Sequence, residues 1–263
     1  MRNECIEYLS TYRTVISATT GIPIYSQLEY ILANMIDENV IGDGEEFFSE
    51  EEISDALGIS RPTVNKAMNT LIDKGYITRE RGKRSYVSSP HKLPLLFIEE
   101  LISFGEMLDR QKIEYSTKLL TRQICRADSL QSQRLRLAEG SELVHLQRLR
   151  FVMDEPIIVV DSWCDAKRFH WLMDIPAEGF SASLIRMMQE KMNIKIEYAE
   201  REVFAARMNA HDALLLQASL WEPCMNLRST NYDTNHEPVE MFSSRLKGNR
   251  CVLRTKLEAA SKK

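Results

Sequence analysis

Apolar residues recur at helical spacing in two short runs in the first third of the chain. The first run lies within 50–57 and stops at Gly58, and the second restarts after Ser60 and stops at Gly75. Apolar positions three or four residues apart form one face of a helix, and glycine commonly follows the last turn. The pattern therefore predicts two short helices joined by a tight turn.

A basic hairpin is predicted after the second of these helices. Two strand-like runs, 76–78 and 85–88, flank the loop 79–84, in which Gly82 is the natural turn residue. Before both helices, Pro23 opens a longer amphipathic segment, which gives a third helix. Three helices followed by a basic hairpin are typical of a winged DNA-binding domain.

The starts of the two short helices carry capping residues. Ser49 precedes the first, with Glu52 three residues later, the spacing of a capping box. Ser60 precedes the second, where we expect its hydroxyl to cap the helix, and Pro62 falls in the first turn, where its missing N–H costs nothing.

Charge is distributed unevenly along this region. The whole chain has a formal net charge of −4, which taken alone argues against a nucleic-acid partner. Residues 23–60 hold ten acidic side chains and no Lys or Arg, whereas residues 61–84 hold seven basic and two acidic ones, a balance of 7 − 2 = +5. The basic surface thus coincides with the second short helix and the hairpin, the two elements that would face a duplex.

Individual residues on these elements suit DNA contacts. The guanidinium of Arg61 matches guanine O6 and N7, and the amide of Asn65 matches adenine N6 and N7. Thr63 suits a phosphate or a thymine methyl group, and basic residues at the hairpin suit phosphates. A merely solvated polar face is the alternative for the asparagines. The predicted DNA-binding residues are Arg61, Thr63, Asn65, Lys66, Asn69, Lys83 and Arg84.

The second part of the chain has longer alternating segments, and its length of 263 residues predicts two domains. Strand-like runs in hairpin order, with helices interspersed, predict an α+β fold with a mostly antiparallel sheet. The expected organisation is an extension at 1–21, the winged domain at 22–88, a linker at 89–94, a second domain at 95–258 and a tail at 259–263.

Composition limits the other classes of function. No run is apolar enough to span a bilayer and no secretory signal is present, so we expect a cytoplasmic protein without a membrane partner. The five cysteines and five histidines are scattered, which favours reduced thiols and gives no support for a metal site. We expect no cofactor.

Polar residues on the predicted strands of the second domain suggest a ligand site. Arg148 and Arg150 are two residues apart, so they project from one face of a strand among apolar neighbours. Their planar forks of N–H donors suit a phosphate or carboxylate. Asp161 and Glu240, on neighbouring strands, would pair with the arginines or accept from a ligand. A structural ion pair at a half-buried sheet edge is the alternative.

At these motifs the first domain resembles the winged helix-turn-helix of the GntR family of bacterial transcription regulators. The resemblance covers about 65 residues and includes the Ser49-Glu50 pair, which adds Ser49 to the DNA-binding residues, and the turn from Leu57 to Arg61. Glu51 and Asn65 stand where the family usually has arginines. The resemblance therefore implies DNA binding at an operator that differs from the family consensus.

Residues from about 95 to 257 are similar to UTRA, the ligand-sensing domain of the HutC subfamily, whose fold is like that of chorismate lyase. The Leu-x-Arg-Leu-Arg strand and the final Glu-Pro-Val-Glu strand carry the similarity. Ile185 and Leu246 replace tyrosines of relatives that bind amino-sugar phosphates. The resemblance implies that the effector-binding residues are Ser103, Phe104, Gly105, Arg148, Arg150, Asp161, Ser183 and Glu240.

Together these features predict a metabolite-responsive repressor. It would bind a palindromic operator as a homodimer, because one winged domain contacts only a half-site, and a small phosphorylated or carboxylated effector would release it. An enzyme of chorismate-lyase-like fold is the alternative, although no nucleophile and base pair is apparent. A sensor that no longer binds a specific operator is the third possibility.

Overall fold

The chain divides into two units, Met1–His91 and Lys92–Lys263, and each is considered by itself. The computed structural model describes residues 2–79, 84–88, 93–94, 101–181, 183–220 and 222–253. Within those ranges, no helix combines the length and the apolar character needed to cross a membrane. Lys83 and most of the predicted linker lie outside them.

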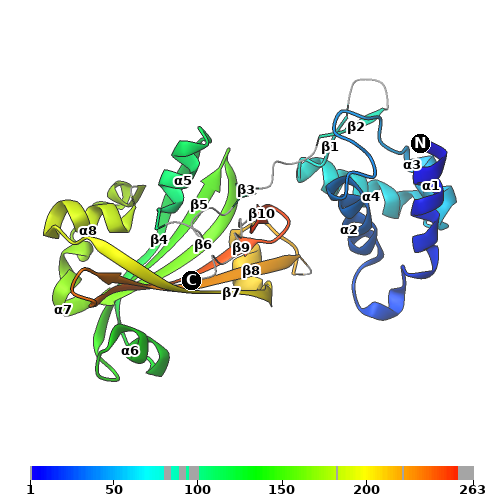
Figure 1. Ribbon diagram of the computed structural model, residues 1–263. Helices are drawn as coiled ribbons and strands as arrows, with labels where there is room; N and C mark the ends of the chain where they lie inside the picture. The colour runs from blue at the N-terminus through cyan, green and yellow to red at the C-terminus, as the bar shows by residue number, and fades with distance from the viewer. Residues whose placement is uncertain are drawn as a thin grey trace, which may run out of the picture. The chain divides into compact units, whose positions relative to one another are not determined.

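The first unit contains the predicted three helices and hairpin, preceded by one further helix. The hairpin strands pair antiparallel, with Ile77 opposite Val87, and they follow the helices directly (Figure 1). The elements are α1 (Arg2–Ser10), α2 (Ile24–Asp37), α3 (Glu50–Leu57), α4 (Arg61–Asp73), β1 (Ile77–Arg79) and β2 (Ser85–Val87).

The core of this unit is made by the apolar faces that the sequence pattern predicts. Leu28 of α2, Ile53 of α3 and Val64 of α4 are fully buried in one cluster. The capping box of Ser49 and Glu52 is confirmed, since Glu52 N–H donates to the serine hydroxyl at 3.2 Å and Ser49 N–H donates to the carboxylate at 2.8 Å. Gly58 ends α3 with a positive φ of 69°, a conformation that costs glycine little.

The expected cap at Ser60 is wrong in its detail. Ser60 is the residue before α4, but its hydroxyl accepts no hydrogen bond from the helix. It lies 2.9 Å from the hydroxyl of Thr63 instead. Thus the sequence gives the correct start of the helix while the side chain uses a different partner.

Helix α1 packs on the core of the first unit, although its sequence predicts only an extension. Leu9 is fully buried there. Arg2 donates to the carboxylate of Glu52 at 2.9 Å, and this hydrogen bond lowers the pKa of Glu52 to about 2. The helix therefore contacts both the hydrophobic core and the capping box of α3.

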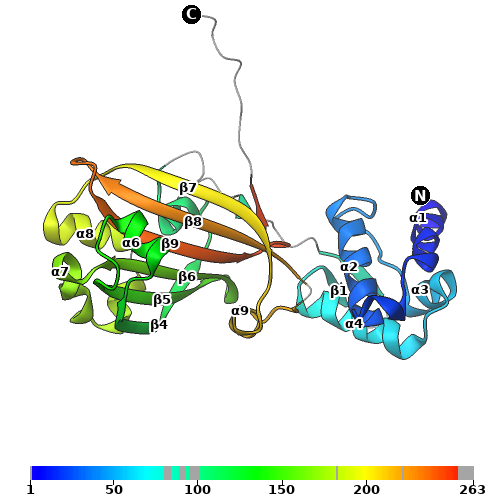
Figure 2. The same ribbon diagram turned by 90° about the horizontal axis from the view of Figure 1, so that it is seen from below.

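The second unit is built on one antiparallel sheet, as the sequence predicts. Its six strands follow the order β4-β5-β6-β9-β8-β7 (Figure 2). The elements are β3 (Leu93–Pro94), α5 (Phe104–Arg110), β4 (Tyr115–Arg126), α6 (Ser129–Leu135), β5 (Glu142–Val152), β6 (Glu155–Asp165), α7 (Ala166–Phe169), α8 (Leu184–Met192), β7 (Ile196–Arg207), α9 (Ala210–Leu215), β8 (Pro223–Asp233), β9 (Pro238–Lys247) and β10 (Cys251–Val252).

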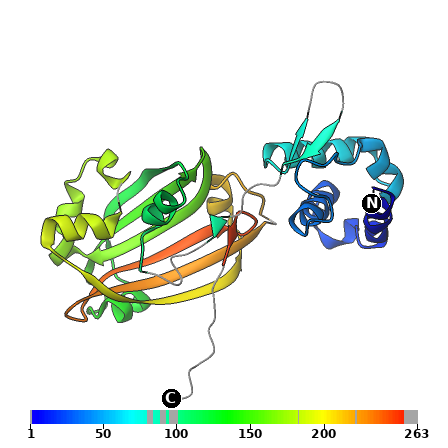
Figure 3. The ribbon, with the colours of Figure 1, turned by 45° about the horizontal axis from the view of Figure 1, so that its top comes forward.

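Both faces of the sheet are covered in part by helices. On one face, α5 packs against Ile158 and Val160 of β6, and α8 packs against Leu146 of β5; Figure 3 shows α5 lying over this face. On the other face, α6 packs near Met241 and α9 near Val159, and both lie on the near side in Figure 2. Because successive side chains of a strand point to opposite faces of the sheet, neighbouring residues of one strand contact different sets of helices.

The end of the predicted linker is part of the second unit. Leu93 and Pro94 form the short strand β3, which pairs in parallel with β10. Leu93 N–H donates to the carbonyl of Arg250 at 2.8 Å, and the Leu93 side chain is buried. Leu93 and Pro94, which the sequence analysis placed in the linker, therefore pair with a strand of the second unit.

The packing of α1 is tested by the substitution Leu9→Ala. Removing a fully buried leucine side chain should lower the free energy of unfolding of the first unit by about 2–5 kcal/mol. Hydrogen exchange of α2 peptides should quicken accordingly. All three tryptophans, Trp163, Trp171 and Trp221, lie in the second unit, so the tryptophan fluorescence transition should not move.

Val15→Ala is the matched control, because Val15 lies in the same segment and is 63% exposed. It should leave exchange in α2 unchanged. Equal exchange rates for Leu9→Ala and the native protein would contradict a role for this segment in the core.

Candidate functional site

The predicted DNA-reading residues lie on the exposed side of α4, where acidic side chains of α3 already contact them. Arg61 donates to Glu51 at 2.6 Å, and both side chains are about two-thirds exposed, at 65% and 68%. Asn65 donates to Glu50 at 2.8 Å, and Arg79 of β1 donates to the same carboxylate oxygen at 2.8 Å. The structure thus brings Arg61 and Asn65 together with two carboxylates that the sequence analysis did not pair with them.

The other predicted DNA-binding residues have local contacts. Asn69 donates to the Asn65 side-chain oxygen at 3.0 Å, and the Lys66 ammonium lies 3.7 Å from the centre of the Tyr25 ring. The hydroxyl of Thr63 contacts that of Ser60, and Ser49 caps α3. Arg84 is paired with Glu46 at 2.9 Å and is 69% exposed.

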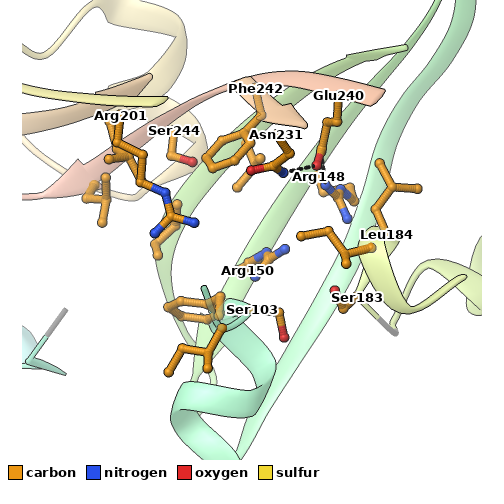
Figure 4. Close-up of a pocket in the computed structure, with 17 residues that line it drawn as sticks. Ser103, Arg148, Arg150, Ser183, Leu184, Arg201, Asn231, Glu240, Phe242 and Ser244 are labelled. Atoms are coloured by element: carbon orange, nitrogen blue, oxygen red, sulfur yellow. Dashed lines mark hydrogen bonds and ion pairs between the residues drawn. The ribbon is translucent and has the colours of Figure 1, made fainter. Parts of the chain in front are cut away.

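A pocket lies on the α5 and α8 face of the sheet (Figure 4), and the empty space within it, including the part that is open solvent, is about 590 Å³. It is lined by the residues before and at the start of these two helices and by side chains of five strands. Six of the eight predicted effector-binding residues line it: Ser103, Phe104, Arg148, Arg150, Ser183 and Glu240.

Arg148 is the most deeply buried charge of this pocket, at 2% exposed. Its Nη2 donates to the Ser162 hydroxyl at 2.8 Å and lies 3.8 Å from Oε1 of Glu240. Asn231 donates to the other oxygen of Glu240 at 2.9 Å. Nε and Nη1 of Arg148 are buried without a hydrogen-bond partner among the described residues, and burial lowers the pKa of the guanidinium.

Arg150 lies on the same face, one step further along β5. Its guanidinium carbon lies 5.0 Å from the centre of the Phe104 ring, and its buried Nε has no hydrogen-bond partner in the described chain. Burial and the adjacent charge of Arg148 lower the pKa of Arg150 to about 9. Two guanidinium groups with unused N–H donors therefore face one carboxylate in this part of the pocket.

Asp161, a predicted effector-binding residue, does not line this pocket, because it points to the opposite face of the sheet. It lies between Val160, which lines the pocket, and Ser162, which contacts Arg148. Its carboxylate accepts from His145 at 2.6 Å and also from Arg245. The period of two along a strand places consecutive residues on opposite faces.

Gly105 does not line the pocket either. A side-chain carbon at Gly105 would lie 2.7 Å from the hydroxyl of Tyr115. The glycine therefore allows Tyr115 of β4 to approach α5 closely. Its role in this structure is packing of the helix that carries Phe104.

Sequence reasoning missed several polar residues of the pocket. Ser244 lines it and could have been found by counting in twos from Glu240 along β9. Asn231 and Arg201 are contributed by β8 and β7, whose place beside β9 depends on the order of the strands. No local signal in the sequence distinguishes Arg201 from the other charged residues of β7.

The described lining of the pocket suits binding better than catalysis. It contains three arginines and one carboxylate, and no histidine, cysteine or lysine. Serine hydroxyls are present, but in the described chain no hydrogen bond joins the hydroxyl of a lining serine to a carboxylate or an imidazole; that of Ser103 accepts from the N–H of Glu106. The chemistry available is recognition of charge and hydrogen-bonding groups.

Replacing the buried charge of Arg150 should stabilise the ligand-free second unit. We expect Arg150→Met to raise the free energy of unfolding at pH 7, because Arg150 has no ion-pair partner among the described residues; replacement of whole buried ion pairs by apolar side chains sets an upper scale of about 1–4 kcal/mol. Urea unfolding followed by tryptophan fluorescence measures it. Arg126→Met, at a side chain that is 73% exposed, should change little.

The difference in the free energy of unfolding between Arg150→Met and the native protein should shrink as the pH rises. The folded-state pKa of Arg150 is about 9, below its ordinary value of 12.5. Above pH 9 the folded native protein loses this proton while the unfolded chain keeps it, so native stability rises relative to the variant. A difference between native protein and variant that is the same at pH 7 and pH 10 would contradict the lowered pKa.

Comparison with known families matches both units. Residues 110–251 match the UTRA domain, and residues 24–87 match the gntR family of bacterial regulatory proteins. The UTRA match alone covers more than half of the chain. Both matches agree with the fold class predicted from the sequence.

Individual relatives match over most of their length. The "Probable fructoselysine utilization operon transcriptional repressor" of Escherichia coli K12 is 23% identical over 234 residues, which cover 88% of this chain and 93% of that protein. The "Histidine utilization repressor" of Klebsiella aerogenes is 24% identical over 221 residues, 81% of this chain and 86% of that protein.

A solved structure shares the fold of both units. The crystal structure of PhnF from Mycobacterium smegmatis has a TM-score of 0.60 at 22% identity, and the match covers 89% of this chain and 99% of that one. The two family matches agree with the winged helices of the first unit and the pocket of the second. The chain therefore belongs to the GntR family of bacterial regulatory proteins, as a transcription regulator with a DNA-binding winged helix-turn-helix and an effector-binding UTRA domain, and it is not an enzyme.

Proposed function

We propose that this regulator is a repressor that binds a palindromic operator as a homodimer and is released by a small anionic metabolite. The buried, incompletely paired guanidinium groups of Arg148 and Arg150 carry the proposal for the effector. Each leaves N–H groups unused inside a pocket, and a buried unpaired donor is costly. A phosphate or carboxylate would accept hydrogen bonds from those N–H groups. Its negative charge would offset the repulsion between the two guanidinium groups.

Other groups support an anion at this position. The hydroxyls of Ser103 and Ser183 lie on the same side of the pocket as Arg150 in Figure 4. Ser183 precedes α8 without capping it through its side chain, which leaves its hydroxyl available to a ligand. Two relatives have names that contain the word repressor and refer to the utilisation of a small metabolite, which supports the sign of regulation and the type of effector.

DNA recognition rests on the exposed side of α4. Arg61 and Asn65 have the donor patterns for guanine and adenine, and Arg84 suits a phosphate. The contacts of Arg61 with Glu51 and of Arg84 with Glu46 are largely exposed, and exposed ion pairs contribute little free energy. DNA phosphates and base edges can therefore replace these acidic partners. Two copies are needed because one winged module covers a half-site.

The substitution Arg61→Ala should weaken operator binding by about 1–3 kcal/mol, the discrimination given by one bidentate arginine–guanine pair. Fluorescence anisotropy with a duplex from the DNA upstream of the protein's own gene would measure the dissociation constant at several salt concentrations. Binding should weaken steeply with salt, because phosphate contacts release counterions.

Arg126→Ala is the control for the loss of one positive charge, since Arg126 is an exposed arginine of the second unit. It should leave operator affinity close to that of the native protein. If native protein bound this duplex no better than an unrelated duplex of equal length, the alternative of a sensor without a specific operator would replace the proposal.

Inorganic phosphate is the simplest probe of the effector pocket. At concentrations well above its dissociation constant it should raise the melting temperature of the native second unit, because a ligand that binds only the folded state stabilises it by mass action, about 2.7 kcal/mol at a hundredfold excess. Arg150→Met should abolish this rise, and Arg126→Met should retain it. An equal rise in native protein and Arg150→Met would place the anion elsewhere.

A further inference from the structure

The N-terminal helix α1 brings a charged side chain to the DNA-binding unit, and the family match does not include it. The helix precedes residues 24–87, the region that matches the gntR family, and it lies beside α3 (Figures 1 and 2). Leu9 anchors the helix in the core of the unit. Arg2, the first residue of the helix, is thereby held next to the start of α3.

The Arg2 guanidinium contacts two separate segments of the unit. Its Nε and Nη2 donate to the two carboxylate oxygens of Glu52, at 3.1 and 2.9 Å. Its Nη1 also donates to the carbonyl of Glu46 at 3.4 Å, and its Nη2 to that of Phe47 at 3.3 Å. A planar fork of five N–H donors can make these contacts together, whereas an ammonium group does not match the geometry. Arg2 therefore joins α3 to the loop 45–48.

The contact with Glu52 fixes Arg2 to the start of α3. The carboxylate oxygen that accepts from Nη2 of Arg2 also accepts from the N–H of Ser49, at 2.8 Å. The hydrogen bond from Arg2 contributes most to lowering the pKa of Glu52 to about 2. Glu52 is therefore ionised at pH 7, and Arg2 keeps a charged partner there.

The loop on the other side of Arg2 is paired with the wing strand β2. The N–H of Phe47 donates to the carbonyl of Ser85 at 2.8 Å, and Glu46 forms an antiparallel bridge with Tyr86. The loop thus extends the hairpin by one short segment. Arg2 connects that segment, and with it the wing, to α3.

The carboxylate of Glu46 links Arg2 to a predicted DNA-binding residue of the wing. Its Oε1 lies 3.7 Å from Nη1 of Arg2, and its Oε2 lies 2.9 Å from Nη1 of Arg84. The Arg84 side chain is largely exposed and suits a DNA phosphate. The position of Arg84 therefore depends on the loop that Arg2 holds.

We propose that Arg2 is a positioning residue for DNA binding, which holds the loop 45–48 and the wing against α3 so that Arg84 meets a phosphate while α4 reads the bases. Ordering a loop during binding costs free energy, and a loop that Arg2 has already fixed avoids this cost. The inference rests on the proposed DNA-binding surface and adds the N-terminal helix to the elements on which that surface depends.

A double-mutant cycle on Arg2 and Arg84 tests the inference. Fluorescence anisotropy would measure binding to the duplex from upstream of the protein's own gene and to an unrelated duplex of equal length. Arg2→Gln should weaken binding to both by roughly three- to tenfold, a factor within the coupling found in one hydrogen-bond network, because phosphate contacts do not depend on base sequence. In the Arg84→Gln background the same change should have little further effect.

Two further variants separate positioning from charge. Arg2→Lys keeps the positive charge but loses the fork, so it should weaken binding nearly as much as Arg2→Gln. Arg13→Gln removes an exposed charge of the same N-terminal segment and should leave the affinity close to native. Native affinity in Arg2→Lys, or an equal effect of Arg2→Gln with and without Arg84, would overturn the inference.

Hydrogen exchange separates positioning from stability. In Arg2→Gln, exchange should quicken at the amide of Phe47, which donates to the wing, while exchange in α2 stays native. Equal quickening in α2 would show that Arg2 contributes to folding stability alone, and the positioning role would fall.

The two duplexes also separate this inference from the proposed function. If native protein binds both duplexes equally and the cycle still shows coupling, the specific operator fails and the role of Arg2 stands. If native protein prefers the upstream duplex and Arg2→Gln changes neither affinity, the operator stands and the inference fails. Absence of binding to either duplex would overturn both.

Discussion

Arg148 is held at the centre of the sheet by contacts from two other strands, and a third strand supports one of these contacts. Ser162 of β6 accepts from it at 2.8 Å, and Glu240 of β9 lies 3.8 Å away and is itself held by Asn231 of β8. Removing a charge from water costs several kcal/mol unless partners compensate for it. These strands must therefore keep their register for the arginine to remain paired, and the geometry of the pocket depends on that constraint.

A second polar network lies directly behind the first, on the other face of the sheet. Asp161 contacts His145 of β5 and Arg245 of β9, and Arg245 also contacts Asp212 at 3.2 Å. Burial opposes ionisation of Asp161, but the hydrogen bond from His145 and the charge of Arg245 outweigh it and lower the pKa of the carboxyl. The middle of β6 is thus tied to its neighbours on both faces, by Ser162 on one and Asp161 on the other.

The winged unit places its acidic residues against its basic ones. Glu50 accepts from Asn65 and Arg79, and Glu51 accepts from Arg61. The acidic segment noted in the sequence is therefore not a separate surface, because part of it lies beside the reading helix. These contacts orient the side chains proposed to read DNA, and the exposed ion pair of Arg61 with Glu51 contributes little free energy. In the proposed mode of DNA binding, phosphates and bases replace these acidic partners.

The sequence by itself determined the elements and the type of each unit. Local periodicity and capping residues are short-range properties, so the helices of the winged unit, its hairpin strands and the mostly antiparallel sheet of the second unit could be predicted from them. The placement of Arg148 and Arg150 on one face of the sheet followed from the period of two along one strand. Only the tertiary structure decided which face of each neighbouring strand meets them, because that depends on register across strands that are distant in sequence. For this reason Asp161 was assigned to the wrong face, and Arg201 and Asn231 were found only when the strand order brought β7 and β8 to the same pocket.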